Sequence, residues 1–263
     1  MNGTVTYSRL GQNGRLANQL FQIAATIAYA LDTKKDFVFP PWEYAKYFQK
    51  EIPQKHNLHI APAACGHCEP HFHYAGIPHY PGDVELFGHY QSEKYFAHRR
   101  EELLPYFKLK PEYNNHIWNK YGWHLKNKPT SCAIHVRRTD YDTPVNRDYH
   151  GVMPMSYYDD AIESLYGVLY PDDVLFVICS DDPEWCKENF KLPHMLLPEG
   201  EENIIDLFIM SFCRDNIIAN SSFSWWSAWL NRNPGKRVVS PQKWFNNAPH
   251  NSKDVHCEKW IVI

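Results

Sequence analysis

The sequence lacks the features of several large classes of protein. No apolar run approaches the roughly 18 residues that a membrane-spanning helix needs, and the N-terminal stretch has no apolar signal-peptide core. The formal net charge is only -3, which argues against bulk nucleic-acid binding, and neither an internal repeat nor a low-complexity tract occurs. These absences predict a soluble globular protein of the cytoplasm, with no transmembrane segment and no nucleic-acid partner.

Glycine is scarce, with 12 residues in 263, and the G-x-G-x-x-G fingerprint of dinucleotide-binding proteins is absent. The nearest approach is GQNGRLANQ, residues 11–19, which places Gly14 and Arg15 between a predicted strand and a predicted helix. Taken alone, this pattern is a weak indication of a ligand site. We expect Asn18, near the helix start, to face the same crevice as the sites described below.

Aromatic residues make up 15% of the chain, and there are seven cysteines. Abundant aromatics suit sugar-stacking surfaces, but an aromatic-rich core is the commoner explanation. Cys132, Cys179 and Cys213 lie in apolar runs, which predicts reduced thiols in the core. The composition is therefore typical of an ordinary globular protein.

The segment CGHCEPHFH is a candidate metal cluster. Its C-x-x-C half has the spacing of zinc ligands, but its two histidines are closer together than in the usual H-x₃₋₅-H pattern. A loop with free thiols is therefore favoured over a structural zinc. The residues concerned are Cys65, Cys68, His71 and His73.

Hydrophobic periodicity predicts a strand, a turn-rich loop, a helix and a second strand over residues 1–39. Residues 40–88 show no clear periodicity and are predicted to form loops, apart from short pieces. A helix is predicted from Ser92, a good N-cap, to Pro105, and residues 119–130 look like a polar link. Beyond that link, predicted strands alternate regularly with helices.

This alternation favours parallel sheets joined by crossover helices, the doubly wound plan of α/β proteins. Two such halves predict a two-lobed protein, with an N-terminal lobe at residues 1–125 and a C-terminal lobe at residues 126–263. The ligand is expected between the lobes, where the carboxyl ends of the strands meet.

The segment AIHVRRTDYD, residues 133–142, ends a predicted strand with two adjacent arginines. Both side chains are expected at the sheet edge where this fold binds ligands. The planar guanidinium suits phosphate oxygens, so Arg137 or Arg138 could bind a diphosphate while the other pairs with Asp140. An anion site is favoured over the alternative, a surface cluster of ion pairs.

The segment NSSFSWWSAWLN places serines between a predicted strand and a helix that starts near Phe223 or Ser224. A helix N-terminus lined by hydroxyl groups and free amides is suited to phosphate. Plain capping by Ser221, Ser222 or Ser224 explains the pattern equally well. The three tryptophans of this segment are expected in the core.

Three motifs together point to a family. GRLANQLFQIA, HVRRTDY and ANSSFSWWSAWLN, in that order, closely resemble glycosyltransferase family 11, the α-1,2-fucosyltransferases, and the resemblance covers nearly the whole chain. It implies a GT-B fold with an active-site cleft between two Rossmann-like lobes. It also implies GDP-β-L-fucose as donor, bound by the C-terminal lobe, with the acceptor on the N-terminal side. Inversion at the sugar carbon and catalysis without a metal or other cofactor are implied too.

The resemblance assigns roles to individual residues. It implies that Arg137 contacts the β-phosphate and neutralises the departing GDP, while Asn18 meets the fucose and phosphate from the other lobe. A carboxylate at Asp206 would accept hydrogen bonds from the guanine N1–H and amino group. The residues implied in binding GDP-fucose are His135, Arg138, Asp140, Asp206, Ser221, Ser222, Phe223, Ser224, Gly14 and Arg15.

The base that deprotonates the acceptor hydroxyl is the least determined part. Asp142 lies close enough to the arginines to serve, but capping of the turn before Pro144 is slightly favoured as its role. Carboxylates such as Glu43 or Asp83, or direct proton transfer to the departing phosphate, are alternatives. The first motif also has Ala17 where the family favours glycine.

The resemblance implies a galactose-terminated glycan as acceptor, with attack by its 2-hydroxyl group. Three rival interpretations remain. The Asp-x-Asp pattern at Asp140–Asp142 is also that of metal-dependent GT-A transferases. A non-catalytic glycan-binding protein would explain the aromatics, and another fucosyltransferase of the superfamily could make a different linkage.

Overall fold

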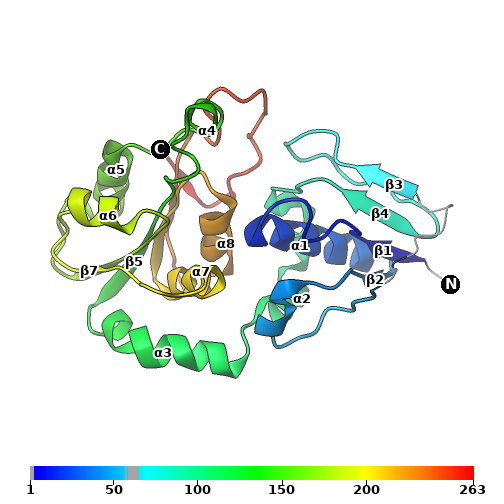
Figure 1. The fold of residues 1–263 in the computed structure, drawn as a ribbon, viewed down its shortest axis with the longest axis horizontal. Helices are drawn as coiled ribbons and strands as arrows, with labels where there is room; N and C mark the ends of the chain where they lie inside the picture. The colour runs from blue at the N-terminus through cyan, green and yellow to red at the C-terminus, as the bar shows by residue number, and fades with distance from the viewer. Residues whose placement is uncertain (1–2, 57, 59–64) are drawn as a thin grey trace. The chain divides into compact units, whose positions relative to one another are not determined.

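The computed structural model describes residues 3–56, 58 and 65–263. Its contacts divide the chain into two compact units (Figure 1). Unit 1 comprises residues 1–113 and 250–257, and unit 2 comprises residues 114–249 and 258–263. Each unit contains one sheet in which every strand pairs in parallel, so the α/β class predicted from the sequence is confirmed.

Unit 1 is built on the four-stranded sheet β2-β1-β4-β3. Helix α1 (Leu16–Asp32) follows β1 and is almost entirely buried, because apolar and small residues occupy most of its surface. The loops predicted for residues 40–88 were wrong in part, since β3 and β4 lie there. Each has only four residues, too few for periodicity to show, and pairing with neighbouring strands fixes them. The strands are β1 (Thr4–Thr6), β2 (Asp36–Val38), β3 (Cys65–Cys68) and β4 (Val84–Phe87).

The helix predicted from Ser92 to Pro105 is instead a series of short turns. Ser92 does act as an N-cap, and its hydroxyl accepts a hydrogen bond from the Lys94 amide at 3.3 Å. The backbone then leaves helical geometry at Phe96 (φ -148°, ψ -6°) and again at Arg99 (φ -109°, ψ 19°), and most of the region is 3₁₀ rather than α. The elements are η2 (Glu93–Tyr95), η3 (Ala97–Arg99), α2 (Arg100–Leu103) and η4 (Leu104–Phe107); a similar turn, η1, spans Glu43–Tyr47.

Unit 2 is built on the six-stranded sheet β10-β9-β8-β5-β6-β7. The central strands β5 and β6 pair over seven residues each and are buried nearly throughout, as expected for strands covered on both faces. The strands are β5 (Thr130–Val136), β6 (Val174–Ser180), β7 (Met195–Leu196), β8 (Asp215–Ile217), β9 (Val238–Ser240) and β10 (Ile261–Val262).

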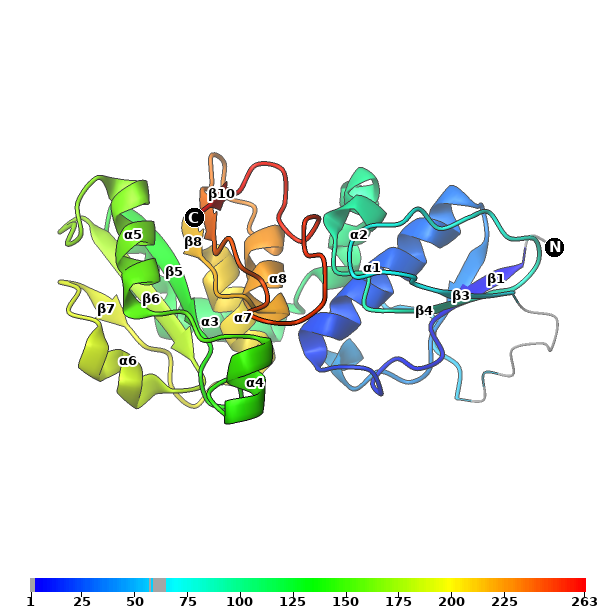
Figure 2. The same cartoon turned by 90° about the horizontal axis from the view of Figure 1, so that it is seen from above.

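Helices cover both faces of this sheet (Figures 1 and 2). Helices α5 and α6 pack on one face, where Tyr158, Ile162 and Cys186 join a buried cluster with residues of β5 and β6. Helices α7 and α8 pack together on the other face. The bounds are α4 (Pro144–Tyr149), α5 (Met155–Tyr166), α6 (Pro183–Asn189), α7 (Asn203–Phe212) and α8 (Ser222–Leu230).

The polar link predicted for residues 119–130 was wrong, because most of it belongs to helix α3 (Pro111–Lys126). The predicted lobe boundary at residue 125 falls inside this helix. Only Ile117, Tyr121 and Gly122 of α3 are buried, which leaves an apolar stripe too narrow to recognise from the sequence. None of the helices in the described residues is long and apolar enough to cross a membrane.

Candidate functional site

Arg137 follows the last residue of β5 at the carboxyl edge of the unit 2 sheet. Its Nη2 atom lies 2.7 Å from Asp140 Oδ2, and its Nη1 atom lies 3.2 Å from Asp181 Oδ2. Asp181 follows the neighbouring strand β6, so the parallel pairing of the two strands brings the residues together. The side chain is 21% exposed. The guanidinium is therefore oriented by two carboxylates while one part of it stays accessible to a ligand.

Arg138 is fixed more tightly to the protein. Its guanidinium bonds Asp182 Oδ2 at 3.3 Å and Asp142 Oδ2 at 3.2 Å, and it lies 4.2 Å from the centre of the Trp185 ring. Its backbone amide donates to Asp181 Oδ1 at 2.9 Å. These contacts join the loop after β5 to the loop after β6, so Arg138 holds the shape of this edge.

Asp142 lies where the chain turns into α4. One of its oxygens bonds Arg138, and the other accepts from Arg147 Nε at 2.8 Å and from a second nitrogen of that guanidinium. The cap of α4 is Thr143, whose hydroxyl accepts from the Asn146 amide. Both oxygens of Asp142 are thus engaged by cations, which opposes proton abstraction by this carboxylate.

His135 lies two residues before Arg137 and is only 4% exposed. Its ring centre lies 5.4 Å from that of Phe223, in the first turn of α8. Burial, reinforced by the positive charge of Arg137, lowers the pKa of His135 to about 3. Among the described residues its Nδ1 atom has no hydrogen-bond partner. The imidazole is therefore neutral and has a free nitrogen at the sheet edge.

The first turn of α8 follows β8 directly. Ser221 caps it by accepting from the Phe223 amide at 3.3 Å, and the helix begins at Ser222, one residue earlier than predicted. Ser224 is fully buried, and its hydroxyl donates to the carbonyls of Ala219 and Ser221. Ser222 and Phe223 are half-buried. The Ser222 amide and hydroxyl, rather than the Ser224 hydroxyl, are the groups available to an anion here.

The tryptophans of α8 form core packing, as predicted. Trp225 and Trp226 are completely buried, and Trp229 is 2% exposed. The cysteines assigned to the core, Cys132 and Cys213, are fully buried, and Cys179 is 4% exposed.

Asp206 lies in the first turn of α7, beside the end of β6. Its carbonyl oxygen is 4.0 Å from the thiol sulfur of Cys179. Among the described residues its Oδ1 atom is buried without a hydrogen-bond partner. Burial, with a contribution from the negative charge of Glu201, raises the pKa of Asp206 to about 7. The structure thus holds an unsatisfied carboxyl group at the same edge as Arg137.

A cluster around Glu201 fixes the segment before α7. The Glu201 side chain is only 6% exposed and bonds Lys120 at 2.6 Å, Tyr121 at 2.8 Å and His116 at 2.9 Å. All three donors come from α3. The sequence contains no pattern that pairs α3 with residue 201, so sequence reasoning missed this cluster.

Gly14, Arg15 and Asn18 belong to unit 1. Gly14 has φ +92°, and a Cβ atom there would lie 2.3 Å from Asn18 Nδ2, so only glycine fits. The side-chain oxygen of Asn18, Oδ1, accepts from Gln91 Nε2 at 2.8 Å, and Gln19 Nε2 donates to the backbone carbonyl of Gly14 at 2.9 Å. Arg15 is exposed at the N-cap of α1. Gln19 of α1 therefore holds the loop at Gly14, and Gln91 orients the Asn18 side chain.

Sequence comparison decides the family. The model described as "Glycosyl transferase family 11" matches residues 6–263. The chain belongs to this family. It is 36% identical over 188 residues to the O-antigen biosynthesis glycosyltransferase WbnK of Escherichia coli, covering 68% of this chain and 60% of the relative. It is 35% identical to an alpha-1,2-colitosyltransferase of Escherichia coli, covering 69% of this chain and 63% of the relative.

A more distant relative of this family-11 chain is the galactoside alpha-(1,2)-fucosyltransferase 1 of Alouatta caraya, 27% identical over 239 residues. That match covers 83% of this chain and 63% of the relative. The chain therefore spans about 60% of the length of these curated relatives.

Solved structures share the fold. A NodZ alpha-1,6-fucosyltransferase soaked with GDP-fucose superposes with a TM-score of 0.60 at 14% identity, covering 95% of this chain and 98% of that one. POFUT1 in complex with GDP-fucose gives a TM-score of 0.54 at 13% identity, covering 91% and 98%. These neighbours are GT-B fucosyltransferases, so the predicted GT-B class is confirmed for this family-11 chain.

The candidate zinc ligands of the family-11 chain fall partly outside the described residues, since the side chain of Cys65 is not among them. Cys68 is exposed, and the rings of His71 and His73 stack with centres 4.7 Å apart. Within the described part of the chain, no group of three or more His, Cys, Asp or Glu residues is arranged to hold a metal ion.

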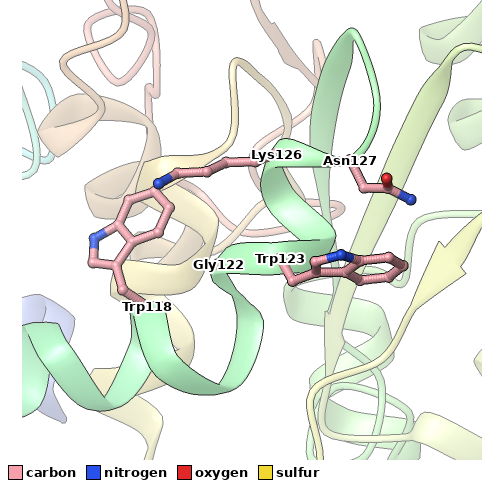
Figure 3. A pocket seen from close by; sticks show the side chains of 5 residues that line it. All are labelled: Trp118, Gly122, Trp123, Lys126 and Asn127. Carbon is pink, nitrogen blue, oxygen red and sulfur yellow. The ribbon is translucent and has the colours of Figure 1, made fainter.

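A pocket of about 350 Å³ lies along α3 (Figure 3). Trp118 and Trp123 flank Gly122, and Trp123 is 68% exposed. The Lys126 ammonium reaches over the Trp118 ring at 4.9 Å. None of the residues assigned to GDP-fucose lines this pocket.

Proposed function

We propose that this family-11 protein is an inverting fucosyltransferase. It transfers L-fucose from GDP-β-L-fucose to the 2-hydroxyl group of a terminal β-galactoside in a glycan. The observation that carries the proposal is the edge of the unit 2 sheet, where Arg137, the first turn of α8 and Asp206 follow three strands of one sheet. Cationic and amide groups suit a diphosphate, and a buried carboxyl group suits guanine.

In this proposal Arg137 binds the β-phosphate with the accessible part of its guanidinium. Asp140 and Asp181 hold that group in place before the donor arrives. The Ser222 amide meets the phosphates at the N-terminus of α8, where the helix dipole favours negative charge. The His135 ring lies beside Phe223, with centres 5.4 Å apart.

The chemistry follows from this arrangement. As the bond between fucose and phosphate breaks, negative charge grows on the β-phosphate of GDP. Donors that are oriented before the reaction stabilise this charge more in the transition state than in the ground state. We propose that Arg137 and the Ser222 amide supply this stabilisation, so that no metal and no other cofactor is required. We propose that Asn18, Gly14 and Arg15, which belong to unit 1, also bind the donor.

A second donor has specific support. One relative is named an alpha-1,2-colitosyltransferase, and its identity to this chain is higher than that of the galactoside fucosyltransferase. Colitosyl transfer at the same edge is therefore the second candidate. A panel of nucleotide-activated sugars distinguishes the two donors by their kcat/KM values, and turnover of either donor excludes a purely glycan-binding protein.

The proposal predicts which nucleotide binds. GDP should raise the melting temperature of the protein and UDP should not, because a carboxyl group at Asp206 pairs with the two N–H groups of guanine. A ligand at 100 times its Kd stabilises the folded state by about 2.7 kcal/mol. Thermal unfolding with each nucleotide at the same concentration measures the difference. Equal stabilisation by UDP would refute the donor assignment.

A further inference from the structure

His150 is the C-cap residue of α4, and aromatic rings surround its side chain. Its ring is stacked on Tyr141, with centres 4.3 Å apart and planes at 7°. Tyr149 contacts it edge-on at 4.6 Å, and Phe245 lies 5.9 Å away. The side chain is half-buried. These contacts fix the plane of the imidazole while leaving part of it accessible.

Two contacts tie His150 to the candidate phosphate site. The Arg137 guanidinium lies 5.6 Å from the centre of the Tyr141 ring, whose plane stacks on His150. The Asn220 side chain, at the turn between β8 and α8, donates to the His150 carbonyl at 2.7 Å. His150 is thus held by Asn220, in the turn before α8, and by Tyr141, which lies beside Arg137.

The imidazole is free to accept a proton. Among the described residues neither ring nitrogen of His150 has a hydrogen-bond partner. Burial lowers its pKa, Asp140 opposes the shift and Arg137 reinforces it. The other titratable groups packed against the ring are the phenols of Tyr141 and Tyr149. The neutral form therefore predominates at neutral pH.

We propose that His150 is the catalytic base of the transfer. This inference rests on the proposed function. The acceptor hydroxyl gives its proton to a ring nitrogen of His150 while its oxygen forms a bond to the anomeric carbon of fucose. The bond between that carbon and the β-phosphate oxygen breaks, and GDP leaves with the electron pair, stabilised by Arg137.

The geometry favours His150 over Asp142, the base suggested by the sequence. Both oxygens of Asp142 bond guanidinium groups, from Arg138 and Arg147. Protonating this carboxylate would break two ion pairs, whereas protonating His150 breaks none. Asp142 then acts as a positioning residue that holds Arg138 and the start of α4.

The test compares His150→Gln with Asp142→Asn, and with His124→Gln as a control at an exposed histidine of α3. The quantity measured is kcat at saturating GDP-fucose and acceptor from about pH 5 to about pH 9. Wild-type kcat should fall at acidic pH as one group becomes protonated. His150→Gln should lose about 10²–10⁴-fold in kcat and lose this acidic limb, with unchanged GDP affinity by calorimetry. The control should match the wild type.

Asp142→Asn should keep the acidic limb and weaken GDP binding. Three results would overturn the base assignment: wild-type kcat in His150→Gln, a fall in kcat at acidic pH that persists in His150→Gln, or loss of that fall in Asp142→Asn instead. His150→Asn, with its melting temperature, separates loss of the base from loss of folding. A wild-type protein that transfers no sugar would refute the proposed function, an outcome distinct from each of these.

Discussion

Replacing Arg137 with alanine is expected to lower kcat by about 10²–10³. The substitution removes a cation that Asp140 and Asp181 hold in place at 2.7 and 3.2 Å. Its contribution grows as charge develops on the departing diphosphate, so the loss should appear in kcat more than in KM. Steady-state kinetics with GDP-fucose and a galactoside acceptor measure both constants.

Arg137→Lys should restore little, because one ammonium cannot reproduce the planar fork that bonds two carboxylates and a phosphate. Arg214→Ala is the matched control, since this exposed arginine precedes β8 at the opposite edge of the sheet. Melting temperatures check that each variant is folded. Near-normal turnover of Arg137→Ala would show that the arginine only maintains the structure.

Replacing Asp206 with asparagine is expected to weaken GDP binding by about 10²-fold. The amide keeps the shape of the side chain but turns one acceptor into a donor, which then faces the donors of guanine. Titration calorimetry with GDP measures the loss. GDP affinity of Asp206→Asn equal to that of the wild type would remove Asp206 from the guanine site.

The raised pKa of Asp206 predicts how GDP affinity and folding stability change with pH. Guanine needs the carboxylate, so wild-type GDP affinity should fall below about pH 7, where the group becomes protonated. Folding raises this pKa from 3.8, so the associated stability is fully present below about 3.8 and is lost as pH rises through about 7. Asp206→Asn cannot ionise, and relative to the wild type it should gain stability at pH 8. Thermal unfolding of both proteins at several pH values measures the gain.

Some of the fold could be predicted because it is local. Helix α1 and strands β5 and β6 are long, so the pattern of their apolar residues is sufficient to identify each as a helix or a strand. Strands β3 and β4 have four residues each and are specified by their neighbours in the sheet, which the sequence does not display. Helix α3 was missed because its buried stripe is narrow.

The site divides in the same way. Arg137 and His135 stand together in one motif, so the sequence predicts them as a group. The residues that contact them are not in that motif. Asp181 reaches Arg137 only because β6 pairs with β5. The stacking of His150 on Tyr141, and its bond from Asn220, likewise depend on tertiary packing. Residues that orient other side chains of the candidate site were therefore harder to predict than the residues of the motif itself.

The most direct test of the account is the product of a single reaction. The protein is incubated with GDP-β-L-fucose and a set of terminal β-galactosides in the presence of excess EDTA, and the product is analysed by NMR. We expect an α-linked fucose on the 2-hydroxyl group of galactose, formed at a rate that chelation leaves unchanged. Attachment to another hydroxyl group, retention of the β-configuration, or transfer that stops on chelation would contradict it.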